Sequence, residues 1–213
     1  MLSPRVFHCR VGEMVIFLDV RRNRYLALAS RTASALIEEE FANVPGPILQ
    51  TVAQMGWFAP DARPLPGATA PTLANRELAA LARHERGSRA LIGQALVALV
   101  YARISLRTMP LERLLAAVAR RSANAGARTG SRAIADLVAA FETTARFTMP
   151  RNSCLPRALA LHALLARHGH ACTLSFGVKL HPFEAHCWLQ RDAVLINDTI
   201  EQVGLFVPIM AIR

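Results

Sequence analysis

The segment from residue 152 to residue 198 joins a helical pattern to three strand patterns, and this order most constrains the fold. After Cys154, leucines and alanines recur at helical spacing. Pro156 is tolerated in the first turn, because its missing N–H would have no intrahelical partner. Three strands are then predicted, at residues 173–178, 185–190 and 193–198. The segment therefore predicts an α+β fold in which Cys154 lies at a helix N-terminus.

Cys154, His186 and Asp198 provide a thiol, an imidazole and a carboxylate in an order that suits a cysteine nucleophile. The unpaired N–H groups and the dipole at a helix N-terminus favour the thiolate, which is the nucleophilic form of cysteine. An imidazole within reach can act as the base, and a carboxylate can hold that imidazole in position. These three residues are therefore the candidate catalytic residues.

The strand patterns bring His186 near Asp198 without fixing a hydrogen bond between them. Side chains alternate along a strand, so His186 shares a face with Trp188, and Cys187 points to the other side. With Arg191-Asp192 as a two-residue turn, the last two strands are antiparallel neighbours. In this register Asp198 lies one residue beyond the position opposite His186, and its side chain points to the other face of the sheet, unless a bulge or the strand end shifts the register.

Each candidate also has a purely structural interpretation. A lone cysteine in an apolar helix is usually an inert core residue, and a lone strand histidine is usually half-buried and hydrogen-bonded. Asp198 could instead cap the turn that begins at Thr199. Catalysis is favoured because the three residues occur together, in order, and in fitting local structures.

The other histidines and cysteines match no metal or disulfide pattern. His168, His170 and Cys172 lack the paired spacing of zinc ligands, so we expect no metal and no cofactor. Four cysteines without a disulfide framework fit a reducing cytoplasm, where we expect the protein to work. Residues 1–19 alternate polar and apolar side chains and carry charges throughout, unlike a secretory signal.

A proline-rich stretch divides the chain into three zones. Residues 60–71 contain four prolines and a glycine, which is typical of a semi-rigid linker. Residues 72–213 begin with a helical segment, expected from Thr72 to Thr148, and end in the helix and strands described above. Residues 1–59 read as a small winged-helix-like module, with strands at 6–10, 14–19 and 24–28 and helices at 32–41 and 48–55.

Arginine dominates the charge, and the excess behind the net charge of +10 lies between residues 61 and 150. Such an excess can bind nucleic acid, an anionic membrane or an acidic peptide, although a preference for Arg over Lys can also reflect genome composition. The last helix of the N-terminal module has no Arg or Lys, which argues against its binding in a groove of DNA as a recognition helix. The longest apolar stretch, 90–102, is shorter than the roughly 20 residues of a membrane span and is expected to be a buried helix.

Three motifs carry a resemblance to a known family: Cys154-Leu155-Pro156-Arg157, Ala185-His186-Cys187-Trp188 and Asn197-Asp198. In order and spacing they match the C-L-x-R, A-H-x-W and N-D elements of the leader peptidases of lasso-peptide biosynthesis, the B proteins, which this chain resembles. Those peptidases are a branch of the transglutaminase-like cysteine-protease superfamily. The N-terminal segments 15–19 and 23–26 are similar to the precursor-recognition element often fused in front of them. Cys187 stands where an alanine is usual, and we expect it to face away from the site.

The resemblance implies a cysteine endopeptidase that removes the leader from a ribosomally made precursor and frees the N-terminal amine of the core. Cys154 would be the nucleophile, His186 the base and later the acid, and Asp198 the orienting group. The Cys154 backbone N–H and the Asn152 side chain are candidate oxyanion donors. A separate ATP-dependent cyclase, similar to asparagine synthetase, would then close the ring.

The resemblance further implies that the leader adds as a strand along residues 24–28, against the helix at 48–55. The candidate leader-binding residues are Arg24, Tyr25, Leu26, Leu28, Ile48, Val52 and Met55. No membrane span and no nucleic-acid partner are expected. Two alternatives stay open: an acyl transferase that uses the same triad with an amine acceptor, as transglutaminases do, and a non-catalytic regulator that binds nucleic acid.

Overall fold

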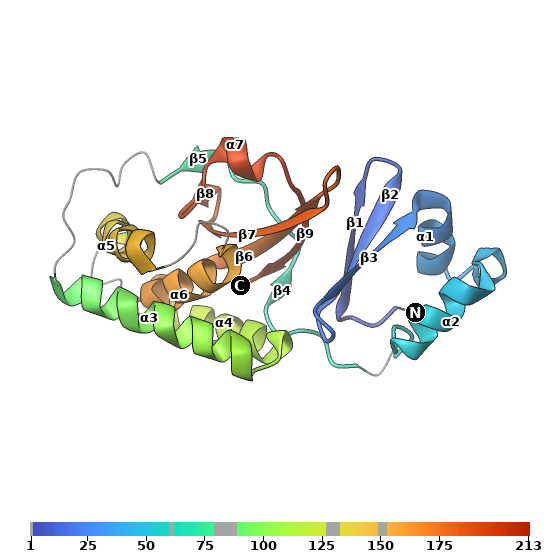
Figure 1. Ribbon diagram of the computed structural model, residues 1–213, viewed down its shortest axis with the longest axis horizontal. Helices are drawn as coiled ribbons and strands as arrows, with labels where there is room; N and C mark the ends of the chain where they lie inside the picture. The colour runs from blue at the N-terminus through green and yellow to red at the C-terminus, as the bar shows by residue number, and fades with distance from the viewer. Residues whose placement is uncertain (1, 60–61, 79–88, 127–132, 149–152) are drawn as a thin grey trace.

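A computed structural model describes residues 2–59, 62–78, 89–126, 133–148 and 153–213 of the chain (Figure 1). It contains a three-stranded sheet near the N-terminus and a six-stranded sheet in the remainder, with helices beside both. The predicted α+β class is therefore confirmed.

The N-terminal module has three strands followed by helices, in the predicted winged-helix-like order. Its elements are β1 (Val6–Val11), β2 (Met14–Asp19), β3 (Arg24–Ala29), α1 (Ser30–Ile37), the 3-10 helix η1 (Phe41–Asn43) and α2 (Gly46–Gln54). Gly12 and Asn23 lie in the two hairpin turns with φ of 58° and 51°. Glycine and asparagine are the residues that tolerate this left-handed conformation best.

The β1–β2–β3 sheet is covered on both faces. On one face, Val15 and Phe17 pack with the buried Trp57 against α1 and α2. On the other face, Ile16 and Leu18 belong to the main core of the larger unit, and both are at most 1% exposed. The N-terminal module and the rest of the chain therefore share one hydrophobic core, in addition to the covalent link between them.

The larger sheet has the strand order β4-β9-β6-β7-β8-β5. Its strands are β4 (Ala68–Thr69), β5 (Arg76–Glu77), β6 (Thr173–Lys179), β7 (Glu184–Arg191), β8 (Val194–Leu195) and β9 (Val207–Ile212). β4 pairs with β9, so the end of the expected linker forms one edge of this sheet. β5 pairs with β8, which corrects the helix expected from Thr72 onward. Two-residue strands depend on a distant partner and leave no local periodicity to detect.

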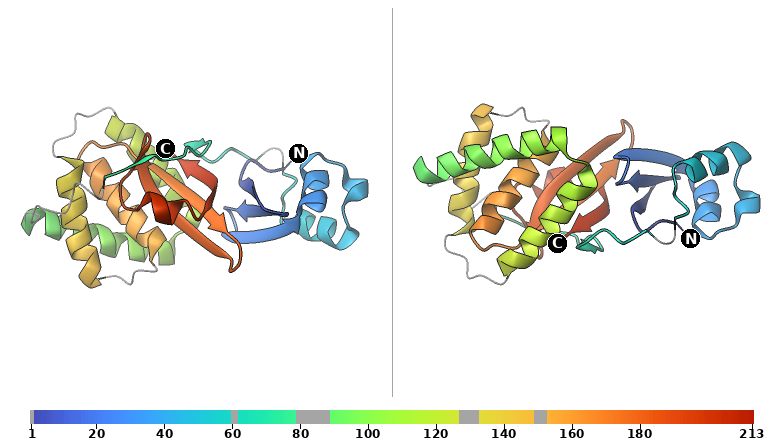
Figure 2. Two further views of the ribbon diagram at one scale, coloured as in Figure 1. Left: turned by 90° about the horizontal axis from the view of Figure 1, so that it is seen from above. Right: turned by 90° about the horizontal axis from the view of Figure 1, so that it is seen from below.

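The larger unit has four long helices: α3 (Arg89–Thr108), α4 (Leu111–Gly126), α5 (Ile134–Thr148) and α6 (Cys154–Arg167). Helix α6 packs on β7 and α4 on β9, whereas α3 and α5 pack on α6. Their apolar residues join those of β6, β7 and β9 in the main core. The short helix α7 (Ile200–Val203) lies on the opposite face, over a small cluster that includes Trp188 and Phe206. In both views of Figure 2, α3, α5 and α6 lie toward one end of the molecule and the N-terminal module lies at the other, with the larger sheet between them.

Helix α3 is more exposed than its sequence suggests. It has 20 residues and is long and apolar enough to cross a membrane by length and composition alone, yet one of its faces packs against α5 and α6. The expectation of a buried helix at 90–102 therefore holds for one face only. The outer face exposes Leu96, Val97, Val100, Tyr101 and Ile104.

Candidate active site

Cys154 is the first residue of α6, as predicted, with Ser153 at the N-cap position. Its side chain is half-buried. The first N–H groups of a helix have no intrahelical partner, and the helix dipole favours negative charge at this end. The position therefore suits a thiolate. Asn152, the second candidate oxyanion donor, lies outside the described residues.

Helix α6 is tied to its neighbours by polar contacts on both sides. Arg157, the last residue of the C-L-x-R motif, donates to Glu142 of α5 at 2.6 Å. The fully buried His162 lies 2.9 Å from the Ser122 hydroxyl of α4, and Ser122 donates in turn to the carbonyl of Cys172. These contacts explain the motif arginine structurally, because it holds the helix that presents the thiol.

His186 lies near the start of β7 and contacts Asp198 directly. Its Nε2 lies 2.5 Å from Oδ2 of Asp198, and Oδ1 of the same carboxylate accepts the backbone N–H of Thr199 at 2.8 Å. Thr199 itself caps α7 through its hydroxyl. The two interpretations of Asp198 are therefore compatible, since one oxygen fixes the turn and the other holds the imidazole.

Asp198 reaches the imidazole by a route that differs from the predicted register. Gln190 pairs with Leu195 rather than with Ala193, and β8 ends at Leu195. The turn consists of Asp192 and Ala193, and Asp192 has a left-handed φ of 53°, which aspartate tolerates better than most residues. Regular strand structure ends at Leu195, so strand alternation no longer decides where Asp198 points.

Asn197 has a role that the motif alone did not reveal. Its Oδ1 accepts the backbone N–H of Leu189 at 2.7 Å, and this bond continues the attachment to β7 after β8 has ended. The bond anchors the residue immediately before Asp198. Asn197 therefore positions the carboxylate, and its place in the N-D motif was the signal that could have identified it.

Two aromatic rings hold the plane of the imidazole. The ring of Trp188 stacks on His186 with centroids 6.1 Å apart, and that of Phe206 lies 5.0 Å away. Gly177 faces His186 across the β6–β7 pair. A Cβ atom at position 177 would lie 2.9 Å from both Phe206 and Trp188. The missing side chain therefore makes room for the rings that orient His186.

Cys187 faces the thiol of Cys154, which corrects the expectation that it points away from the site. The predicted alternation holds, because His186 lies with Trp188 and Cys187 lies on the other face. However, α6 packs on the face of β7 that carries Cys187. Both the thiol and the backbone N–H of Cys187 consequently hydrogen-bond to the sulfur of Cys154. His186 reaches the same sulfur from the start of the strand, and with Nε2 on Asp198 its Nδ1 is the atom left for this contact.

These contacts separate charge between the thiol and the imidazole. The hydrogen bond from Cys187, opposed by burial and reinforced by His186, lowers the pKa of Cys154 to about 4. Burial would lower the pKa of His186, but its bonds to Asp198 and Cys154 outweigh burial and raise that pKa to about 9. The Cys154 thiolate and burial raise the pKa of Cys187 well above its usual range, so Cys187 remains a donor. At neutral pH the pair is a thiolate and an imidazolium, which can attack a carbonyl carbon and protonate a leaving group.

The residues predicted to bind a leader peptide fall into three groups. Accessible surface remains on Arg24, Leu26, Ile48 and Met55. Leu28 and Val52 are buried in the core between the small sheet and its helices. Tyr25 lies on the opposite face of β3, toward the larger unit.

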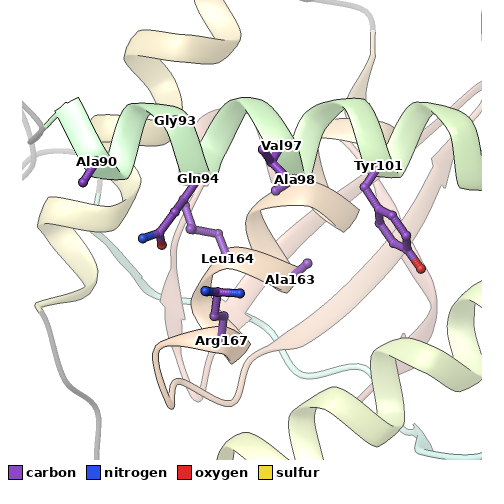
Figure 3. A pocket seen from close by; sticks show the side chains of 9 residues that line it. All are labelled: Ala90, Gly93, Gln94, Val97, Ala98, Tyr101, Ala163, Leu164 and Arg167. Carbon is purple, nitrogen blue, oxygen red and sulfur yellow. The ribbon is translucent and has the colours of Figure 1, made fainter.

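The described residues also form an apolar groove of about 580 Å³ between α3 and α6, and Cys154 does not line it. Figure 3 shows the α3 side chains along this groove, with Leu164 and Arg167 of α6 opposite them. Arg167 ends α6, whereas Cys154 begins it. Within the described part of the chain, no group of three or more His, Cys, Asp or Glu residues is placed to hold a metal ion.

Comparison with known proteins identifies one family. The family described as the Transglutaminase-like superfamily matches residues 96–211, which is 116 of the 213 residues. The matched region contains Cys154, His186 and Asp198, together with the strands and helices that position them. Comparisons with curated proteins and with solved structures returned no match.

Proposed function

Because the chain belongs to the transglutaminase-like superfamily, we propose that it is a cysteine endopeptidase that removes the leader from a ribosomally synthesised lasso-peptide precursor. The observation that carries the proposal is the set formed by Cys154 at the start of α6, His186 of β7, which contacts the thiol, and Asp198, which is bonded to His186. The resemblance of the three motifs to lasso leader peptidases supports the choice of substrate. The localisation that fits these properties is the cytoplasm, where precursors are made and thiols stay reduced.

The geometry suits a two-step hydrolysis. The Cys154 thiolate attacks the carbonyl carbon of the scissile bond, and the oxyanion accepts a hydrogen bond from the backbone N–H of Cys154. The His186 imidazolium gives its proton to the leaving nitrogen, which departs as the N-terminal amine of the core. The leader is left as a thioester on Cys154. Neutral His186 then takes a proton from water, and the water oxygen attacks the carbonyl carbon of the thioester. The leader leaves as the acid, and the Cys154 thiolate and the His186 imidazolium are restored.

The N-terminal module offers a surface for the leader. Among the described residues, β3 forms one edge of its sheet and has a hydrogen-bonded strand on one side only. An added strand would gain main-chain hydrogen bonds there, which suits a peptide of variable sequence. The partly exposed Leu26, Ile48 and Met55 would receive its apolar side chains. The product amine would then pass to an ATP-dependent cyclase similar to asparagine synthetase.

Family membership also fits a second activity, which is acyl transfer to an amine through the same thioester. The two activities differ only in the acceptor that resolves the acyl-enzyme. Products in the presence and absence of a primary amine separate them, because transfer gives a leader amide that is heavier than the free acid by the mass of the amine minus water, and hydrolysis gives the free acid. We expect the leader to be released as the free acid in both conditions.

Mass spectrometry of the purified protein with its precursor peptide tests the proposal. We expect an intact leader and a free core, and an uncut precursor with Cys154→Ala. Cys9→Ala is the matched control, because burial raises the pKa of Cys9 to about 11 and the thiol lies on β1, outside the catalytic set. Cleavage by Cys154→Ala at the wild-type rate would overturn the proposal.

A further inference from the structure

A trough runs over helix α6, with α3 as one wall and α4 as the other. The groove between α3 and α6 is lined on the α6 side by Ala163, Leu164 and Arg167 (Figure 3). A second hollow, of about 190 Å³, lies between α4 and α6 and shares Ala163 and Arg167 with the groove. Arg121 of α4 lines this hollow, and its guanidinium carbon lies 5.6 Å from the ring centroid of Tyr101, which lines the groove. The groove and the hollow are therefore one continuous surface, and α6 is its floor.

The wall formed by α3 carries an exposed apolar stripe. Its members recur three or four residues apart, so they lie along one side of the helix. They are between 49% and 69% exposed, and they are Val97, Val100, Tyr101 and Ile104. Single exposed apolar residues are normal on a protein surface, whereas a contiguous apolar patch marks an interaction site. The stripe and the groove beside it therefore form one apolar surface that suits a partner.

The shape of the trough suits a helix. Small side chains make up much of its lining, so the backbone of an added helix can approach closely; these residues are Ala90, Gly93, Ala98, Ala163 and Ala166. A groove between two helices is the usual receptor for an amphipathic helix, which inserts the apolar side chains of one face. A membrane surface instead receives apolar side chains that protrude, and it cannot fill a recessed groove. The recess therefore favours a helix over a lipid surface.

The trough is bordered by positive charge. Arg103 lies beside the apolar stripe, on the flank that helical geometry turns away from α6, and Arg121 and Arg167 line the other side. None of these three arginines forms an ion pair within the described part of the chain. Among the described residues, no Asp or Glu lines the groove or the hollow. Carboxylates along both flanks of an incoming helix would match this arrangement.

We propose that the trough is a docking site for an amphipathic α-helix of a partner protein, with apolar residues on one face and Asp and Glu on both flanks of that face. The apolar side chains would enter the groove beside α3, and the carboxylates would meet Arg103 on one flank and Arg121 and Arg167 on the other. A second copy of this chain fits less well, because its net charge is +10 and the same arginines would face each other. Cys154 lines neither part of the trough, so the inference is independent of the proposed function.

A designed helical peptide tests the charge pattern. The probe is a fluorescein-labelled peptide of about 18 residues, with Leu at positions i, i+3, i+4 and i+7 and Glu on both flanks, and a second peptide has Lys in place of every Glu. Fluorescence polarisation in about 150 mM salt should show binding of the Glu peptide and much weaker binding of the Lys peptide. Arg103→Glu combined with Arg167→Glu should weaken binding of the Glu peptide by about tenfold or more and strengthen binding of the Lys peptide. The matched control is Arg31→Glu, since Arg31 is exposed on α1 in the N-terminal module and should leave both affinities unchanged.

Gly93→Trp tests the groove itself. A Cβ atom at position 93 would meet no atom within 4 Å, so the indole can occupy the groove without a clash at its base. The Glu peptide should then bind at least about tenfold more weakly, and Cys154 alkylation by iodoacetamide should show that the fold is intact. Three results would overturn the proposal: equal affinity for the Glu and Lys peptides, binding to phosphatidylglycerol vesicles without binding to the Glu peptide, or a dimer in sedimentation equilibrium that Gly93→Trp abolishes. Failure of the protein to cleave a precursor would overturn the proposed function and leave this inference standing.

Discussion

Cys187→Ala should shift the pH dependence of the catalytic thiol without abolishing catalysis. The substitution removes the S–H donor that contacts the Cys154 sulfur, and the backbone N–H at position 187 stays in place. Hydrogen bonds to charged groups are worth about 1.5–3 kcal/mol, and a thiol is a weak donor, so we take a value near the lower bound. About 1.4 kcal/mol corresponds to one pKa unit.

The pKa of Cys154 should therefore rise by about one unit, from about 4 in the intact site. At pH 4.5 the thiolate fraction would fall from about three quarters to about one quarter, whereas at pH 7 it would stay nearly complete. Activity at neutral pH should accordingly be close to that of the wild-type protein. Because Cys187 is buried, the substitution should also lower the free energy of unfolding by about 1 kcal/mol.

The assay is the rate of iodoacetamide alkylation from pH 3.5 to 7, followed on the peptide that contains Cys154. Cys187→Ser is the matched control, because its hydroxyl can replace the lost donor and should restore much of the low pKa. An acid limb at the same pH in the wild-type protein and in Cys187→Ala would refute the reasoning. It would mean that the helix terminus and His186 alone stabilise the thiolate.

Four further outcomes follow from the site and its supports. The pH profile of kcat/KM should rise through about pH 4, as the Cys154 thiolate forms, and fall through about pH 9, as the His186 imidazolium is lost. An acid limb near pH 6.5, the ordinary pKa of histidine, would contradict the ion pair. Asp198→Asn should move the alkaline limb toward neutral pH, because the carboxylate raises the pKa of the His186 imidazole. It should also lower kcat for precursor cleavage by up to about 10⁴-fold, and an unchanged kcat would assign the orienting role elsewhere. Gly177→Ala should lower the free energy of unfolding, measured by chemical denaturation, by about 1–3 kcal/mol, because the added Cβ would meet Phe206 and Trp188 at 2.9 Å. Gly93→Ala is the control, since a Cβ there would meet open space, and it should not lower the free energy of unfolding. Ile48→Glu should weaken leader binding in fluorescence polarisation and leave Cys154 alkylation unchanged; wild-type affinity would exclude that surface.

The sequence pattern predicted those helices and strands that are determined by residues close together in the chain. The strands of the N-terminal module and the start of α6 at Cys154 were predictable, because periodicity and helix-end chemistry act within a few residues. The small strands β4 and β5 were not, since each exists only through pairing with a segment more than a hundred residues away. The exposed face of α3 was not predictable either, because an apolar sequence does not reveal how many neighbours cover it.

The same distinction applies to the candidate site. The sequence motifs identified Cys154, His186 and Asp198 as candidates, and the fold brings them together. The path of Asp198 was mispredicted, because one left-handed residue, Asp192, moved the turn and the strand then ended early. The position of Cys187 beside the thiol depends on which face of β7 receives α6, and that is a tertiary contact. Strand alternation alone could not supply it.

The most direct test of the account is the covalent intermediate. Precursor mixed with excess protein and quenched with acid after short times should yield a thioester between the leader and Cys154, visible as the mass of the leader minus water on the peptide that contains this residue. The thioester should appear before the free leader and should be missing from Cys154→Ala, which should also release no leader. Leader release by Cys154→Ala, or a leader thioester on another cysteine, would contradict the assignment of Cys154 as the nucleophile.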